Sequence, residues 1–150
     1  MPQTIGNLLI REVPLLRVDD AVRDASTTVV EAALPALPVV DRDGRYRGIF
    51  GERELITALF PGYVGALGGA AFVPKSIDAA IEKRQSCWLD PVERYMNAEH
   101  IDVPSDFSDV GLAETFIHHR VLIVPVTDDG SVRGVVTRSE FFQALVERLA

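Results

Sequence analysis

The sequence contains a single cysteine, Cys87, among 150 residues. An intrachain disulfide is therefore excluded, and such cysteine usage permits a reducing compartment. The chain does not open with a charged region followed by an apolar core, and no run approaches the roughly 20 apolar residues of a membrane span. The longest weakly polar run, 58–73, is interrupted by Pro61 and several glycines. We expect a cytoplasmic protein without membrane insertion.

Basic side chains are also in the minority, with 15 Lys and Arg against 22 Asp and Glu and a formal net charge of -7. Non-specific DNA or RNA binding needs clustered positive charge that displaces phosphate counterions. The group formed by Lys75, Lys83, Arg84 and Arg94 is too sparse for such a patch. We therefore expect no nucleic-acid partner, whereas a small phosphate-containing ligand held locally stays compatible with the composition.

Residue combinations typical of catalytic or metal sites are missing from the sequence as well. Cys87 has no base beside it, so a structural or surface thiol is expected. The adjacent His118 and His119 point to different faces of a helix and cannot chelate one metal ion together. The acidic turns lack the ligand spacing of a calcium loop. We expect no metal site and no resident cofactor, and an enzyme with an unrecognised pocket is the weakest of the functional alternatives.

The sequence does contain one pattern twice. The run from Leu37 to Phe50 returns from Val124 to Val136, about 87 residues later and with one residue lost. Hydrophobic residues make up 47% of the chain, which is enough for a sizeable interior. A duplication of this length indicates two similar units that complete each other's core and bind ligands in the groove between them. We place the units at 1–60 and 91–150, separated by the segment 61–90.

Each unit is predicted to contain a strand, a helix, a hairpin and a closing helix. The Asp-Gly pairs between β-rich runs are strong hairpin signals, because glycine accepts the positive φ that a tight turn requires. In the first unit the expected elements are an apolar segment 13–18, a helix capped by Asp19 or Asp20 with Val22, Ala25, Val29 and Ala33 on one face, strands 37–40 and 46–50, and a helix 52–59. In the second unit they are an apolar segment 100–103, a helix capped by Ser108 or Asp109 with Leu112, Phe116 and Ile117 facing inward, strands 122–126 and 132–136, and a helix 139–149.

The segment between the units differs from both of them. Ser76 is positioned to cap a short helix, 77–84. The four aromatic residues of this region are more than a disordered linker usually carries; they are Phe60, Tyr63, Phe72 and Trp88. We expect the segment to pack on the body of the protein, the alternatives being a dimer contact or the docking of another protein.

Short motifs recur in an order typical of one family. The second unit has Met96, Val124-Pro125-Val126, Asp129-Gly130 and the run 134–140, Gly-Val-Val-Thr-Arg-Ser-Glu. The first unit keeps this frame and ends in the run 48–54, Gly-Ile-Phe-Gly-Glu-Arg-Glu. The chain thereby resembles a tandem pair of cystathionine-β-synthase (CBS) domains, except in its central segment. The resemblance implies an α/β (α+β) fold in which two β-α-β-β-α repeats pack as a pseudo-twofold Bateman-type module.

The resemblance also implies a function. Such pairs bind adenosine-containing ligands in clefts between the repeats, form homodimers and regulate enzymes or transporters. We therefore expect a stand-alone regulatory module with an adenine nucleotide as ligand. AMP is favoured, because further phosphates suit the acidic background poorly. The alternative is a ligand-free assembly module that mediates dimerisation or partner docking.

The second repeat offers the better predicted site. By resemblance, Ile101, Asp102 and Val124 line an adenine slot, and Glu140 takes the position of a ribose-binding Asp. A ribose diol is well served by a carboxylate acceptor, and a base by an apolar slot with backbone hydrogen-bonding groups.

The phosphate end of this predicted site lies at the start of the closing helix. The Thr137 hydroxyl and the nearby N–H groups can meet a phosphate at the positive helix end. Arg138 and Arg120 are nearby cations in the sequence. Thr137 and Glu140 also have the three-residue spacing of a helix capping box, a purely structural alternative that can coexist with ligand binding.

The first repeat is predicted to hold a weaker site. Gly51 lacks the hydroxyl of its counterpart, and Glu52 adds negative charge near the expected phosphate, for which Arg53 can compensate. By resemblance, the remaining members of this site are Glu54, Pro14 and Leu37. Gly51 has two readings that the sequence leaves open: an exposed backbone N–H for a ligand, or a tight backbone contact with no ligand.

Overall fold

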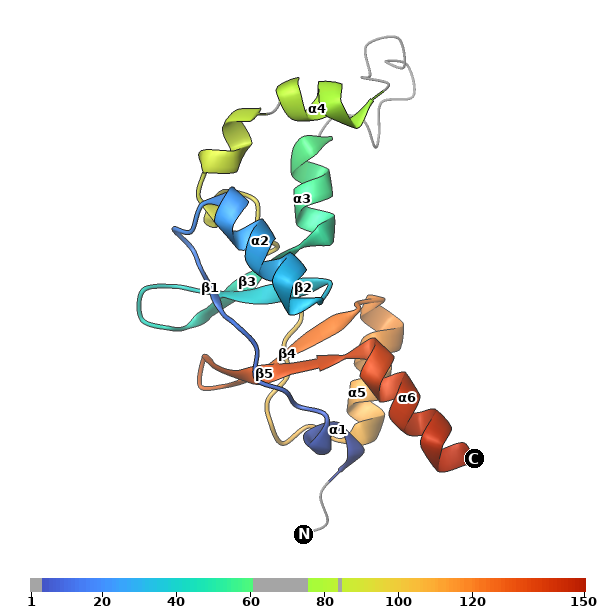
Figure 1. Cartoon of the computed structure of the whole chain (residues 1–150). Helices are drawn as coiled ribbons and strands as arrows, with labels where there is room; N and C mark the ends of the chain where they lie inside the picture. The colour runs from blue at the N-terminus through green and yellow to red at the C-terminus, as the bar shows by residue number, and fades with distance from the viewer. Residues whose placement is uncertain (1–3, 61–75, 84) are drawn as a thin grey trace.

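The computed structural model describes residues 4–60, 76–83 and 85–150. These residues form two similar halves, each with a small sheet flanked by helices (Figure 1). The N-terminal helix lies in the half that holds the C-terminus, and the chain then crosses to the other half (Figure 1). The predicted mixed α/β fold with two β-α-β-β-α repeats is confirmed.

The first repeat contains five elements: β1 (Leu16–Arg17), α2 (Val22–Ala32), β2 (Ala36–Val40), β3 (Tyr46–Gly51) and α3 (Glu52–Leu59). The sheet order is β1-β2-β3, with β1 parallel and β3 antiparallel to β2. All five residues of β2 are buried, because the central strand is covered on both faces.

The second repeat follows the same order with α5 (Asp109–His119), β4 (Ile123–Asp128), β5 (Ser131–Thr137) and α6 (Arg138–Leu149). Strands β4 and β5 form an antiparallel hairpin. The first strand of this repeat is reduced to one parallel bridge between Val103 and Val126, within the predicted segment 100–103. Gly44 and Gly130, the turn glycines of the two hairpins, adopt φ of 79° and 85°, as predicted.

The opening segments of the two repeats are exchanged. Helix α1 (Ile5–Leu8) contacts α5 and α6, and Asp109 accepts the N–H groups of Ile5 and Gly6 at 3.0 and 2.8 Å. The 3₁₀ helix η3 (Val92–Arg94) contributes Val92 to the core of the first repeat. Each repeat is therefore completed by a segment that belongs in sequence to the other, as expected for interdependent units.

The interior consists of two clusters of buried side chains. The cluster around the first repeat includes Phe50 and Leu37, and it extends into the second repeat through Ile123 and Val135. The cluster of the second repeat includes Leu112 and a pair of tilted rings, Phe116 and Phe141, with centroids 5.6 Å apart. Each such fully buried side chain contributes about 1.5–3 kcal/mol to folding.

Three details of the predicted helices are wrong. Ala33, predicted on the inner face of the first helix, is instead its C-cap and is exposed, because the helix ends at Ala32. The N-cap of α2 is Ala21, with no side-chain cap bond, because Asp20 instead accepts the N–H of Arg17 at 2.9 Å. Ile117 is 71% exposed rather than inward-facing, since Leu112 and Phe116 already occupy the buried stripe of α5. Ser108 does cap α5, as predicted, by accepting the N–H of Gly111 at 2.9 Å.

Within the described part of the central segment, residues 85–89 pack on the first repeat. Helix α4 (Ile77–Lys83) is capped by Ser76, which accepts the N–H of Ala79 at 3.1 Å, as predicted. The 3₁₀ helix η2 (Gln85–Leu89) buries Cys87, and Trp88 packs against the core of the first repeat. The predicted contacts of Tyr63 and Phe72 lie outside the described residues.

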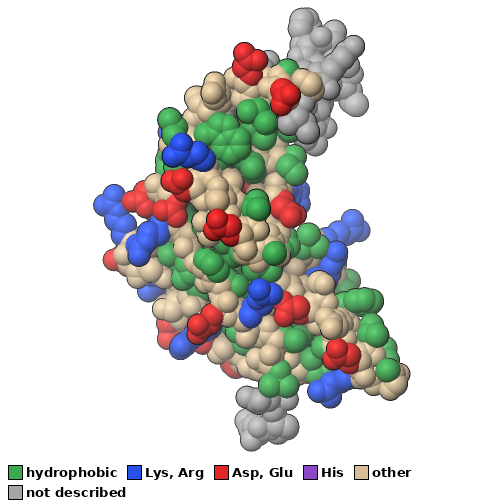
Figure 2. Space-filling model, in the orientation of Figure 1, with side chains coloured by type: hydrophobic (Ala, Val, Ile, Leu, Met, Phe, Trp, Pro, Cys, Tyr) green, Lys and Arg blue, Asp and Glu red, His purple; other side chains and the backbone are tan. Residues whose placement is uncertain are grey.

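Charges of both signs are interspersed on the face drawn in Figure 2. Helix α6 also exposes several apolar side chains, among them Phe142 (66%), Val146 (48%) and Leu149 (87%). Within the ranges described, no helix is both long and apolar enough to cross a bilayer.

Candidate functional site

Two cavities occupy equivalent places between the repeats. The α6 cavity, of about 720 Å³, is lined by the first turn of α6, the loop 33–35, Leu122 and Arg11, among others. The α3 cavity, of about 320 Å³, is lined by the first turn of α3, the loop 119–123 and residues 99–101, among others. Both volumes fall within the range of small-molecule sites, roughly 300–1,000 Å³. Each cavity therefore joins a helix N-terminus of one repeat to a loop of the other.

The polar part of the α6 cavity centres on Glu140. Thr137 is the N-cap of α6, and its Oγ1 accepts the N–H of Glu140 at 3.1 Å. The same hydroxyl lies 3.1 Å from Glu140 Oε1 and donates to it. Arg11 Nη1 donates to this oxygen at 2.8 Å. The capping alternative is thus present in the structure, and a ligand that needs Glu140 must share it or displace Arg11.

The charge balance of the α6 cavity favours an anion. Arg11 and Arg138 line it against one carboxylate, that of Glu140. The N-terminus of α6 adds its positive dipole end. In this first turn the N–H of Arg138 donates to Leu122 O at 2.9 Å, and the N–H of Glu140 donates to Thr137. The N–H and hydroxyl of the exposed Ser139 take part in neither bond and can face a ligand.

The remaining wall of the α6 cavity is apolar. Leu34, Pro35 and Leu122 line it, and Ala33 adopts left-handed geometry with φ of 56° as the C-cap of α2. Pro35 and Leu122 line the α3 cavity as well, so these two side chains stand between the two cavities. An apolar wall of this kind suits the flat face of a nucleobase.

The helix at the α3 cavity has a glycine as its N-cap, whereas the helix at the α6 cavity has a threonine. Gly51 is the N-cap of α3 and provides no side-chain cap. A Cβ at this position would lie 2.1 Å from Pro35 O and 2.4 Å from the Ala36 Cα. The backbone of the neighbouring loop therefore requires glycine here, which favours the tight-contact reading of Gly51.

The α3 cavity is lined by more acidic side chains than the α6 cavity. Glu52 and Glu54 come from the first turn of α3, together with Arg53. Glu54 is only 9% exposed, and burial raises the pKa of its carboxyl, although backbone N–H groups and Arg53 oppose this shift. A phosphate placed beside these carboxylates would be repelled.

His100 also lines the α3 cavity. Its Nε2 lies 2.8 Å from Ile123 O, and because a carbonyl can only accept, Nε2 carries the hydrogen. Burial lowers the pKa of His100, and the hydrogen bond to Ile123 and the charge of Asp102 oppose this shift. Burial therefore favours the neutral form of the ring, with the hydrogen on Nε2 directed at Ile123 O.

The structure separates residues that the sequence interpretation grouped in the better site. Ile101 and Arg120 line the α3 cavity with Arg53 and Glu54, not the cavity that holds Thr137. The reason is the way the two repeats face each other, because the closing helix of one repeat lies against the α2–β2 or α5–β4 loop of the other. This predicted grouping is thus corrected, although the pairs Thr137–Glu140 and Arg53–Glu54 do share a cavity.

Three other predicted residues lie away from both cavity walls. Val124 and Leu37 are fully buried in the two core clusters, because they lie on the inner strands β4 and β2, the first strand of each hairpin. Pro14 is exposed and is not part of either lining.

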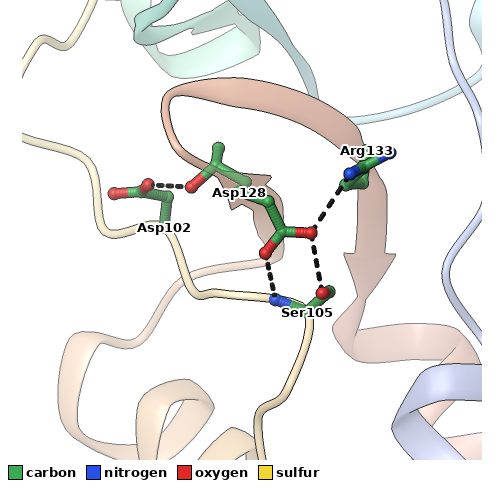
Figure 3. A network of polar contacts seen from close by, with 5 residues as sticks. Asp102, Ser105, Asp128 and Arg133 are labelled. Atoms are coloured by element: carbon green, nitrogen blue, oxygen red, sulfur yellow. Dashed lines mark hydrogen bonds and ion pairs between the residues drawn. The ribbon is translucent and has the colours of Figure 1, made fainter.

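Asp102 belongs to a polar network rather than to a cavity (Figure 3). It accepts the Thr127 hydroxyl at 2.5 Å. Next along the strand, Asp128 accepts the N–H and hydroxyl of Ser105 at 3.1 and 2.7 Å and pairs with Arg133 at 3.1 Å. The bonds from Ser105 hold the pKa of Asp128 below its usual value. The network ties the segment 102–105 to β4, which is a structural role.

Arg11 and the loop 33–35 are site residues that sequence reasoning missed. Asn97 occupies the place of Arg11 in the other repeat, and each of them pairs its backbone with the second hairpin strand of the opposite repeat. Aligning the two repeats could therefore have indicated Arg11 as a site residue, but only to a reader who knew that the opening segments are exchanged. Elsewhere in the described ranges, no three His, Cys, Asp or Glu side chains gather in a way that could hold a metal ion.

Comparisons with known proteins agree with this architecture. The pattern of the CBS domain family matches residues 5–61 and 92–147. A structure of CBSX2 in complex with AMP is similar with a TM-score of 0.72 and 18% identity, covering 99% of this chain and 100% of that one. An acetoin utilization protein (AcuB) from Vibrio cholerae gives 0.73 and 16%, with 99% and 94% coverage. At this identity the likeness shows the fold alone.

A sequence comparison also finds a relative that is a much longer protein than this chain. The A-adding tRNA nucleotidyltransferase of Aquifex aeolicus is 25% identical over 131 residues, which is 86% of this chain. The chain spans 13% of the length of that relative.

Proposed function

Because the chain belongs to the CBS domain family, we propose that it is a non-catalytic regulatory module that binds an adenosine-containing ligand, AMP above all, in the α6 cavity. One observation carries the proposal: this cavity joins an apolar wall, a carboxylate and two arginines at the N-terminus of a twelve-residue helix. The AMP complex of the structurally similar CBSX2 supports the choice of ligand.

The lining suggests how AMP would lie. The base would contact Leu34, Pro35 and Leu122, and the ribose diol would donate to Glu140. The phosphate would meet Arg138 and the N–H and hydroxyl of Ser139 at the N-terminus of α6. Thr137 would act by orienting Glu140, since its hydroxyl is engaged with that residue.

The α3 cavity is proposed as the weaker site. Its smaller volume and the pair Glu52 and Glu54 disfavour a phosphate, whereas Arg53 and Arg120 retain some capacity for an anion. AMP is preferred over ATP because further phosphates would add negative charge to an acidic protein.

The output of binding would pass through other subunits. We propose a homodimer and an enzyme or transporter partner in the cytoplasm, a location that the single cysteine permits. A ligand can shift such an assembly only by binding one arrangement more tightly than another. Sedimentation with and without AMP would detect the dimer and any change in it.

A thermal-shift panel with AMP, ADP, ATP, S-adenosylmethionine and NAD tests the proposal. Ligand at 100 times its dissociation constant stabilises the fold by about 2.7 kcal/mol, or several degrees at this size. The shift should disappear in Glu140→Gln. It should persist in Glu147→Gln, a matched control on the same helix whose carboxylate bonds only Gln143 among the contacts described. A shift that survives Glu140→Gln would place binding elsewhere.

Two observations favour the alternative of a ligand-free assembly module. Glu140 already has two partners, Arg11 and Thr137, and α6 exposes apolar side chains that another chain could cover. Absence of a shift with every nucleotide, together with a stable dimer, would establish this alternative.

A further inference from the structure

We propose that Arg11 makes the α6 cavity selective for a phosphorylated ligand, by exchanging its ion pair with Glu140 for one with the ligand's phosphate. The inference rests on the proposed function and deepens it. In the free protein the Arg11 guanidinium is paired with Glu140, the carboxylate proposed to bind the ribose. In the complex the same guanidinium would bind the phosphate, and Glu140 would be available to the ribose diol.

The backbone of Arg11 is fixed, so the exchange involves its side chain only. Arg11 and Val135 form two backbone hydrogen bonds, of 3.0 and 2.9 Å, which dock the segment on β5. Gly134 permits this approach, since a Cβ there would lie 2.4 Å from Arg11 O. The guanidinium is therefore tethered beside the cavity at constant reach.

The ion pair itself is exposed enough to be replaced. The side chains of Arg11 and Glu140 are 45% and 34% exposed. A pair this accessible to water contributes little to stability, so a stronger partner can replace it. A phosphate offers the guanidinium a dianion and bidentate geometry, which is a stronger partner than one carboxylate oxygen.

The exchange explains why the phosphate would matter to the whole ligand. A nucleoside without phosphate needs Glu140 but gives Arg11 no new partner, so its binding is opposed by the existing ion pair. A nucleotide satisfies both residues at once. The cavity would thus discriminate by the ligand's charge, through a residue supplied by the other repeat.

The α3 cavity lacks this device. Asn97 stands where Arg11 stands, and its side chain accepts the N–H of Glu99 at 3.1 Å. The facing carboxylate, Glu54, is largely buried. Selectivity for phosphate through a displaced ion pair is therefore expected in one of the two cavities.

Calorimetric titration of the full chain with AMP and with adenosine tests the inference. Arg11→Gln should weaken AMP by roughly tenfold, and should leave adenosine unchanged or tighter because Glu140 is released. Arg47→Gln is the matched control, since Arg47 forms a similarly exposed cross-repeat pair with Glu93, at 3.3 Å and outside both cavities. It should retain both affinities.

The outcomes separate the two proposals. If wild-type protein binds neither AMP nor adenosine, the proposed function fails. If AMP binds and Arg11→Gln keeps the wild-type ratio of AMP to adenosine affinity, the function stands and the role of Arg11 is overturned. Should Arg11→Gln not fold, Glu140→Gln gives an independent reading: it frees Arg11, so inorganic phosphate should bind more tightly while adenosine binds more weakly. The same change for both probes would contradict the exchange.

Discussion

The two cavities share one backbone plan and differ in chemistry. The N–H of Arg138 donates to Leu122 O at 2.9 Å, and the N–H of Glu52 donates to Pro35 O at 2.9 Å. These equivalent bonds fix each closing helix against a loop of the other repeat. With this frame kept by main-chain bonds, the side chains around it are free to diverge, and one cavity has become cationic while the other has become acidic.

The divergence is limited by sterics at the N-cap. Thr137 has room for its side chain and uses it to cap α6. Gly51 has none, because the Pro35 carbonyl and the Ala36 backbone approach within 2.1 and 2.4 Å of where a Cβ would be. The comparison teaches that the hydroxyl missing from the first repeat cannot be restored without moving the loop.

The largest effect should therefore come from Gly51→Thr, the substitution that would make the two cavities alike. We expect it to lower the free energy of unfolding by about 2–4 kcal/mol, because the added atoms overlap backbone rather than a flexible side chain. Urea denaturation measures this. The reverse change, Thr137→Gly, removes a cap and should cost only about 1 kcal/mol. Equal costs would mean that the two N-caps are sterically equivalent after all.

The next effect is a change in the free energy of unfolding that should have opposite signs for Glu140 and Glu54. Glu140→Gln should lower stability at neutral pH by about 1 kcal/mol, because the ion pair with Arg11 and the negative charge at the start of α6 are lost. Glu54→Gln should raise it, because the amide removes the desolvation cost that raises the pKa of Glu54. Denaturation of both variants beside wild type checks the signs, and a loss of stability in both would show that Glu54 is satisfied as a carboxylate.

Much of the fold could be predicted from the sequence, because its signals are local. The Asp-Gly turns at 43–44 and 129–130 set both hairpins, and helix α3 has the predicted bounds. The Ser108 cap followed from residue type and position alone. Where two local uses of one side chain compete, as when Asp20 closes a turn at Arg17 instead of capping α2, the sequence pattern does not decide between them.

The membership of the cavities could not be predicted in the same way. Ile101 and Thr137 belong to one repeat, yet the packing of the two repeats against each other places them in different cavities. Arg11 enters the α6 cavity from a segment that a linear reading assigns to the first repeat. A site between two repeats depends on their mutual packing, which is a property of contacts far apart in the chain.

A smaller effect should appear in the pH dependence of stability near pH 6.5, and it distinguishes the α3 cavity, because His100 lines that cavity and no histidine is among the described residues that line the α6 cavity. Burial lowers the pKa of His100 in the folded state below its ordinary 6.5. As the pH falls below 6.5, the unfolded chain takes up a proton that the folded protein does not, so the free energy of unfolding falls. Above this pH the two states do not differ in His100 protonation and its contribution is constant.

The variant His100→Gln keeps a donor toward Ile123 O but cannot titrate. It should flatten the loss of stability as the pH falls below 6.5, measured by urea denaturation. His118→Gln, at an exposed position, is the control and should leave the slope unchanged. An unchanged slope in His100→Gln would assign the acid sensitivity to other groups.

The smallest effect concerns the cationic cavity in the absence of ligand. Arg11→Gln should lower the free energy of unfolding by about 0.5 kcal/mol at low salt, the size typical of an exposed ion pair. Screening at about 1 M salt shortens the Debye length to about 3 Å, so the difference from wild type should vanish there. If the difference persists at high salt, Arg11 stabilises the repeat interface by packing rather than by charge. A guanidinium held by packing could not leave Glu140 for a phosphate, so this small measurement also bears on whether the α6 cavity is set up for exchange.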